Sequence, residues 1–236
     1  MSEVSDRTAR KEEIAARLKQ VRSQLPSGVE LIVVTKNFPS TDIEILFELG
    51  ERNFGENRIQ ELVGKRNLLP AEINQGSTWH FQGQIQSNKI PALNQFADVI
   101  HSLDSRKAIE KIVPQKRVFL QINLDPPTQA RSDGGASRAG INEGELRSFT
   151  ELLYQRFAGN FLGVMAVAPH FAGITQGDIL AAFARLKGMS DEVRQIAPSA
   201  RFISAGMSED FLEAIAHGAT HVRLGSSILG SRSVAN

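Results

Sequence analysis

The sequence contains no cysteine, only one tryptophan and one tyrosine, and no apolar run long enough to span a bilayer. The absence of cysteine excludes disulfides, thiolate metal sites and a cysteine nucleophile. The 27 basic residues are balanced by 26 acidic residues, which gives no reason to expect a nucleic-acid partner. The first residues carry acids and lack the apolar segment of a signal peptide. These absences predict a cytoplasmic protein without membrane contact, stabilised by its hydrophobic core.

Short apolar strand candidates alternate with amphipathic helical patterns along the chain. The predicted strands are residues 31–36, 52–57, 78–83, 97–103, 117–123, 161–167, 201–204 and 220–225. The predicted helices between them are residues 43–49, 58–67, 86–96, 105–113, 142–157, 177–196 and 209–216. Eight such units predict an α/β fold, a single (β/α)8 TIM barrel over residues 1–236. Residues 6–24 predict an extra N-terminal helix before the first strand.

The segment 125–140 interrupts this alternation. It is rich in proline, glycine and serine and has no apolar periodicity, which predicts a long mobile loop after the fifth strand. Two interpretations stay open, because such a loop can close over a site as a lid or be a tolerated surface insertion.

Lys36 ends the β-branched apolar run Leu31–Thr35 and so lies at the carboxyl end of the predicted first strand. Parallel β/α folds place their chemistry at this end. Because burial disfavours the charged form of an amine, a lysine held there is a candidate nucleophile for a carbonyl group. The alternative is a strand-end lysine that extends into solvent.

The loops after the last two predicted strands contain glycine and serine residues. Barrels commonly bind phosphate in these two loops, where glycine permits close backbone approach and a short helix begins. The alternative is that the serines only cap helices. Glu209 and Asp210 would repel a phosphate unless their side chains turn away. The candidate phosphate ligands are Ser204, Gly206, Met207, Ser208, Gly225 and Ser226.

Arg223 lies two residues before Gly225 on the last predicted strand, so both share one side-chain direction, which is predicted to face the barrel interior. An interior arginine needs an acceptor, either an acidic side chain or a ring nitrogen of a ligand. A lysine on the first strand, an arginine on the last strand and a phosphate cradle together suit a phosphorylated pyridine aldehyde. Pyridoxal 5′-phosphate (PLP) is such a molecule.

Six motifs at ordered positions carry a resemblance to a known family. They are Val34-Thr35-Lys36, Phe54-Gly55-Glu56-Asn57, Trp79-His80-Phe81-Gln82-Gly83 with Gln86-Ser87-Asn88-Lys89, Gly163-Val164-Met165-Ala166, Gly206-Met207-Ser208-Glu209-Asp210 and Val222-Arg223-Leu224-Gly225. In these motifs the chain resembles the pyridoxal phosphate homeostasis protein family over nearly its whole length. The chain departs from the family at Asn37-Phe38 and within residues 125–140.

The resemblance implies a barrel of the alanine-racemase N-terminal type that carries PLP as an internal aldimine on Lys36. It implies that Arg223 faces the pyridine nitrogen, that Asn57 and Met165 line the ring, and that His80 lies close by. It also implies that Ser204, Ser208, Gly225 and Ser226, with neighbouring amides, hold the phosphate. The family is associated with vitamin B6 and amino-acid homeostasis.

Three functions are compatible with such a site. The first is PLP binding and homeostasis without efficient catalysis, in a monomer that exchanges PLP with PLP-dependent apo-enzymes. The second is a low-activity amino-acid racemase, which needs a second base; the only tyrosine, Tyr154, is predicted to lie on a helix away from the site. An arginine at the pyridine nitrogen also weakens PLP as an electron sink. The third is a PLP-free aldolase with a lysine Schiff base.

Overall fold

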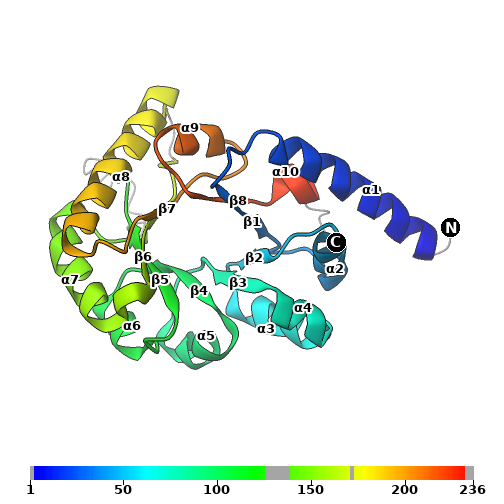
Figure 1. Ribbon diagram of the computed structural model, residues 1–236, viewed down its shortest axis with the longest axis horizontal. Helices are drawn as coiled ribbons and strands as arrows, with labels where there is room; N and C mark the ends of the chain where they lie inside the picture. The colour runs from blue at the N-terminus through cyan, green and yellow to red at the C-terminus, as the bar shows by residue number, and fades with distance from the viewer. Residues whose placement is uncertain (1–2, 126–138, 171–172, 232–236) are drawn as a thin grey trace.

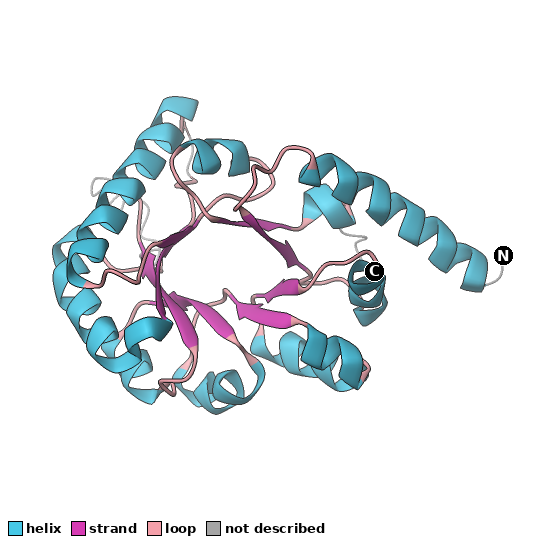
Figure 2. Ribbon diagram, viewed as in Figure 1, coloured by secondary structure: helices cyan, strands magenta, loops and turns pink. Residues whose placement is uncertain are grey.

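The computed structural model describes residues 3–125, 139–170 and 173–231. Eight parallel strands close into a barrel in chain order, and helices surround it (Figures 1 and 2). This confirms the predicted (β/α)8 barrel. The strands are β1 (Glu30–Val34), β2 (Asn53–Glu56), β3 (Thr78–Phe81), β4 (Val99–Leu103), β5 (Arg117–Ile122), β6 (Phe161–Ala166), β7 (Phe202–Ser204) and β8 (His221–Leu224).

The helices follow the predicted order, with two additions, at residues 71–76 and at residues 226–229. Residues 71–76, which were not predicted to be helical, form a short helix after α3, beginning just after Pro70. The helices are α1 (Glu3–Arg22), α2 (Ser40–Glu48), α3 (Ile59–Leu68), α4 (Ala71–Gly76), α5 (Ile90–Phe96), α6 (Arg106–Lys111), α7 (Leu146–Phe157), α8 (Gln176–Ile196), α9 (Phe211–Ala216) and α10 (Ser226–Leu229). Three short 3-10 turns are η1 (Ser87–Lys89), η2 (Glu143–Glu145) and η3 (Ala158–Asn160).

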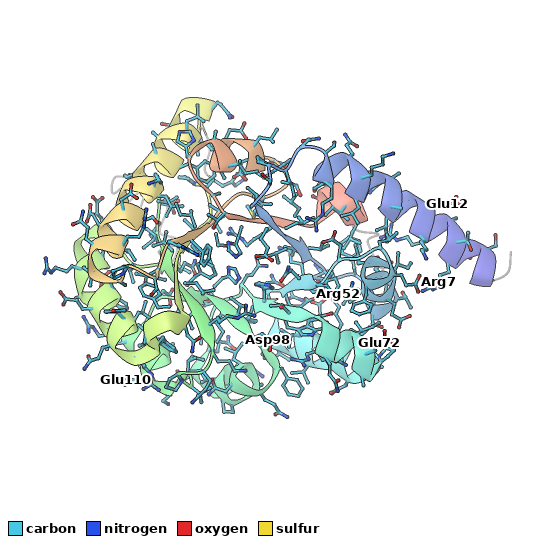
Figure 3. The ribbon with its side chains drawn as sticks, viewed as in Figure 1. Arg7, Glu12, Arg52, Glu72, Asp98 and Glu110 are labelled. Carbon is cyan, nitrogen blue, oxygen red and sulfur yellow. The ribbon has the colours of Figure 1, made fainter. Side chains whose placement is uncertain are left out.

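The extra N-terminal helix α1 lies beside α2 and α10 at the outside of the barrel (Figure 1). Arg10 joins all three helices: it donates to Asp42 Oδ2 on α2 at 2.7 Å and to the Leu229 carbonyl on α10 at 2.9 Å. Charged side chains on the outer helices, such as Glu12 of α1 and Glu110 of α6, point into solvent (Figure 3). The helix α1 therefore ties the first and last β/α units together.

Side chains along the strands point alternately toward the surrounding helices and toward the barrel interior. Trp79 and Phe81 on β3 face the helices and belong to the large core between sheet and helices. A smaller apolar cluster of Val99, Phe119 and Met165 is separate from that core. Aromatic contacts place the buried His101 and His221 beside Phe119 of this cluster.

The predicted loop 125–140 falls mostly on residues 126–138, outside the described parts of the chain. Residues 139 and 140, at the end of this loop, are described. The Gly140 N–H donates to Asp104 Oδ2 at 3.0 Å, and the Gln121 side chain donates to the Ala139 carbonyl at 3.1 Å. The described end of the loop is thus fastened to β5 and to the segment after β4.

Candidate functional site

A cavity of about 890 Å³ lies at the carboxyl ends of β1 and β8. Six of the eleven residues predicted for the site line this cavity. The strands bring together positions from the first, seventh and eighth units, because β1 pairs with β8 to close the barrel. The six residues are Lys36, Met207, Ser208, Arg223, Gly225 and Ser226.

The segment that carries Lys36 is fixed from behind by a buried ion pair. Lys65 on α3 donates to the Thr35 carbonyl at 2.7 Å and to Glu56 Oε1 at 2.7 Å. Thr35 Oγ1 also donates to Glu56 Oε1 at 2.6 Å, and both Glu56 and Lys65 are buried. Burial raises the pKa of Glu56, while the Lys65 ammonium acts in the opposite direction. These contacts set the backbone immediately before Lys36.

Glu61 completes this support on the other side of Lys36. Its carboxylate accepts hydrogen bonds from Lys65 Nζ at 2.8 Å and from the Asn37 backbone N–H. Asn37 adopts the left-handed conformation, with φ of 64°, which asparagine tolerates better than most residues. Sequence reasoning missed this network. Its available signal was the Glu61 and Lys65 spacing, which places both on one helix face.

The serine hydroxyls of the last two loops meet at the cavity. Ser226 Oγ donates to Ser208 Oγ at 3.1 Å, and Ser208 Oγ donates to Ser227 Oγ at 3.2 Å. Asp210 Oδ1 accepts from the Met207 N–H at 2.6 Å, so this acid is used within its own loop. The side-chain hydroxyls of both loops therefore converge on one point.

Gly206 shapes the seventh loop. Its φ is +92°, and a Cβ there would lie 2.8 Å from the Phe211 Cα, where α9 packs closely against the loop. Its carbonyl accepts from the Arg223 backbone N–H at 3.0 Å. Gly206 therefore acts through the backbone and is not one of the residues that line the cavity.

Arg223 is 3% exposed and lines the cavity wall, which confirms its predicted inward direction. Its Nη1 donates to Ser204 Oγ and its Nη2 donates to the Ala166 carbonyl, both at 2.8 Å. Burial lowers the pKa of Arg223 to about 10, so the group stays protonated at neutral pH. Among the described residues these two acceptors occupy two of the five guanidinium N–H groups.

Four further predicted residues lie outside the cavity lining. Ser204 and Met165 are buried, and Ser204 contacts Arg223 rather than the cavity. His80 is also buried, bonded to His101 and Asn53. Asn57 is exposed after β2, where its carbonyl lies against Gly83.

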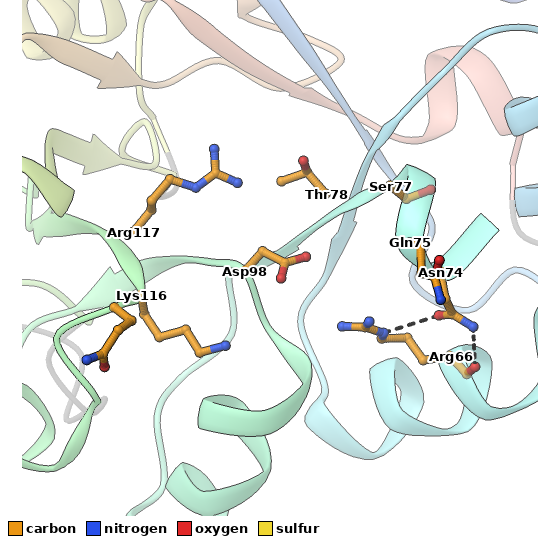
Figure 4. Close-up of a pocket in the computed structure, with 9 residues that line it drawn as sticks. Arg66, Asn74, Gln75, Ser77, Thr78, Asp98, Lys116 and Arg117 are labelled. Atoms are coloured by element: carbon orange, nitrogen blue, oxygen red, sulfur yellow. Dashed lines mark hydrogen bonds between the residues drawn. The ribbon is translucent and has the colours of Figure 1, made fainter. Parts of the chain in front are cut away.

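A second cavity of about 480 Å³ lies at the opposite, amino-terminal ends of the strands (Figure 4). Arg66, Lys116 and Arg117 gather there around Asp98. Burial lowers the pKa of Lys116, and Asp98 opposes this change. None of the predicted site residues lines this cavity. In the described part of the chain, no group of three acidic or histidine side chains could hold a metal ion, and no helix is long and apolar enough to cross a membrane.

The fold and this site define a class of protein. Residues 10–233 match the family described as alanine racemase, N-terminal domain. Similar folds occur in alanine racemase from Corynebacterium glutamicum, with 14% identity and a TM-score of 0.69 over 92% of this chain and 60% of that chain. At this identity the likeness shows the fold alone.

More similar proteins narrow the class. A Mycobacterium bovis pyridoxal phosphate homeostasis protein is 33% identical over 256 residues, covering 94% of each chain. The Pseudomonas aeruginosa protein of that name is 31% identical and covers 98% of this chain and 97% of its own. PipY of Synechococcus elongatus, solved with PLP bound, is 35% identical with a TM-score of 0.77, over 92% of this chain and 100% of that chain. The chain belongs to the pyridoxal phosphate homeostasis protein family.

Proposed function

We propose that the chain binds PLP in the cavity at the carboxyl ends of β1 and β8 and serves PLP and amino-acid homeostasis without efficient catalysis. The observation that carries this proposal is one cavity wall that presents Lys36, the buried Arg223 and the Ser208 and Ser226 hydroxyls together. PLP supplies an aldehyde that can be held covalently by an amine. The whole chain, residues 1–236, acts as one PLP-binding domain.

Each part of the cavity suits one part of PLP. Lys36 provides the amine for the aldehyde, and Arg223 can donate only, which suits an unprotonated ring nitrogen. Ser208, Gly225 and Ser226, with the backbone amides of the loop around Gly206, hold the phosphate; the Met207 N–H is already donated to Asp210 Oδ1. Of the remaining predicted ligands, Asn57 does not line the cavity; its carbonyl lies against Gly83, next to the cavity residue Gln82. Ser204, His80 and Met165 are buried in the barrel interior and support the site without lining the cavity, Ser204 by accepting a hydrogen bond from Arg223.

The position of Tyr154 argues against a racemase. It lies on α7 at the outside of the barrel and is 42% exposed, so it cannot serve as a second base at Lys36. An arginine at the ring nitrogen keeps that nitrogen unprotonated, which weakens the stabilisation of a carbanion. The residues therefore bind and orient PLP more than they promote proton transfer.

We propose a cytoplasmic monomer that exchanges PLP with PLP-dependent apo-enzymes and has no nucleic-acid or membrane partner. Within the described residues, the closed barrel leaves no strand edge for pairing with another chain. Light scattering after size-exclusion chromatography tests the monomer, and recovery of activity by an apo-enzyme given the loaded protein tests the exchange.

The decisive experiment is absorption spectroscopy with PLP, followed by borohydride reduction and mass mapping. A pyridoxyl group on Lys36 is expected, and Lys36→Ala should abolish it. Lys116→Ala is the matched control, because that lysine lies in the opposite cavity and should not change the adduct. A protein that gives no adduct, or an adduct that survives Lys36→Ala unchanged, would contradict the proposal.

Arg223 has its own test. Arg223→Ala should weaken PLP retention by about tenfold, the effect of losing one charge-assisted hydrogen bond. Arg223→Lys keeps the charge but lacks the planar fork, so it should recover only part of the affinity. Unchanged affinity in Arg223→Ala would refute its role at the ring.

A further inference from the structure

Two buried histidines that do not line the cavity connect Arg223 to the far end of the barrel. His80 on β3 and His101 on β4 lie 2.8 Å apart, from Nδ1 to Nε2. His101 Nδ1 lies 2.9 Å from Ser204 Oγ on β7, so this contact spans non-adjacent strands across the barrel interior. His80 Nε2 lies 3.0 Å from Asn53 Oδ1 at the start of β2.

The groups at the two ends of this chain of hydrogen bonds determine which atom donates and which accepts at each step. At the site, the Arg223 guanidinium can only donate, and it donates to Ser204 Oγ. At the other end, Asn53 Nδ2 donates to Glu30 Oε1 at 3.1 Å, and a carboxylate can only accept. The Asn53 amide must therefore present its oxygen to His80.

The two ends determine the protons between them. A neutral imidazole has one donor and one acceptor nitrogen. His80 donates from Nε2 to Asn53, so its Nδ1 accepts from His101 Nε2–H. His101 Nδ1 then accepts from the Ser204 hydroxyl. Burial lowers the pKa of both histidines well below 6.5, which favours these neutral forms.

Packing also holds the hydrogen-bonded His101 ring in place. The His101 ring stacks on Phe119 with centroids 4.6 Å apart and an interplanar angle of 20°. The other charged or titratable groups that act on His101 are His80, Arg223, His221 and Arg117. None of them is an acid, so the surroundings offer no stabilisation to a protonated His101.

We propose that His101, aligned by His80, is a positioning residue that holds the Arg223 guanidinium in place through the Ser204 hydroxyl. With its hydrogen committed to His101, Ser204 keeps its oxygen lone pairs for Arg223. Without His101 the hydroxyl rotates, and the guanidinium loses one of its two fixed acceptors. The role at the PLP ring rests on the proposed function, whereas the donor and acceptor order of the hydrogen bonds does not.

Nuclear magnetic resonance of the protein without PLP tests the proton positions in these hydrogen bonds. Histidine ¹⁵N spectra at pH 7 should show protons on Nε2 and not on Nδ1 in both His80 and His101. The Arg223 Nη–H signals should exchange slowly with water. A proton on Nδ1 of either ring would overturn the assigned order, whatever the protein binds.

Variants of His101 test the consequence. In His101→Leu, the Arg223 Nη–H signals should broaden or vanish, and PLP should bind about tenfold more weakly. His101→Asn can keep an acceptor for Ser204, so it should recover most of both effects and also serves if the leucine variant does not fold. Phe119→Leu is the matched control, because it alters the packing on His101 without removing a hydrogen bond.

The outcomes separate the two proposals. Unchanged Arg223 signals in both His101 variants would refute the positioning role even if PLP binds Lys36. A wild-type protein that gives no Lys36 adduct would refute the proposed function, while the apo spectra still decide the role of His101. Equal effects in Phe119→Leu and His101→Leu would assign the result to packing, against the proposal.

Discussion

Removing the Lys65 ammonium should destabilise the protein strongly, because Lys65 is the buried partner of Glu56. Its Nζ donates to three oxygens within 2.8 Å, two of which also position the residues beside Lys36. Removing one partner of a buried ion pair typically costs about 3–5 kcal/mol. In Lys65→Met we expect about 3 kcal/mol, at the lower end, because burial already raises the Glu56 pKa and favours uptake of a proton.

The assay is urea unfolding at pH 7 with linear extrapolation of the free energy of unfolding. The double variant Glu56→Gln/Lys65→Met should recover about 2 kcal/mol relative to the sum of the single variants, because it removes the fully buried Glu56 charge together with its partner. Lys187→Met is the matched control. Its pair with Asp191 is about half exposed, so the cost should stay below about 1 kcal/mol.

A cost in Lys65→Met that equals the Lys187 control would refute the reasoning. So would strict additivity in the double variant, because independent losses would mean that Lys65 and Glu56 do not interact. The rate at which Lys36 is labelled by PLP and borohydride should fall in Lys65→Met. It should not fall in Lys187→Met, which lies away from the site.

Three further perturbations give distinct results. The interior histidines have a lowered pKa, about 4 for His221, so below pH 6.5 the unfolded state binds more protons and stability falls with pH down to about 4. His221→Phe should reduce this slope by about 1.4 kcal/mol per pH unit. Gly83→Ala should cost about 2 kcal/mol and weaken PLP binding, because its Cβ would lie 1.8 Å from the Asn57 carbonyl. Arg10→Ala should cost about 2 kcal/mol by unpairing the buried Asp42.

The same unfolding experiments can contradict these three expectations. A flat stability profile between pH 6.5 and 5, or an unchanged slope in the His221 variant, would show that the interior histidines take up protons in the folded state. A Gly83→Ala protein with wild-type stability would show that the loop can move away from Asn57. A neutral Arg10→Ala would mean that the Arg10–Asp42 ion pair adds nothing to the stability of the barrel.

The sequence by itself determined the fold and the two strand-end residues of the site, Lys36 and Arg223. Apolar runs of strand length, alternating with helical periodicity, are local properties, and eight of them allow few arrangements other than a closed barrel. Lys36 and Arg223 follow from this order, because the first and last strands of a barrel must pair. The glycine and serine residues of the last two loops follow from the same closure.

Only the tertiary structure decided how the site is supported. Met165, Ser204 and His80 are predicted site residues, yet their side chains do not line the cavity but lie in the barrel interior, because strand register and tilt set which positions face inward. The partners of these residues, and the buried Lys65 behind Lys36, are distant in sequence. Local patterns carry no record of such contacts, since they arise only when separate strands and helices close around one interior.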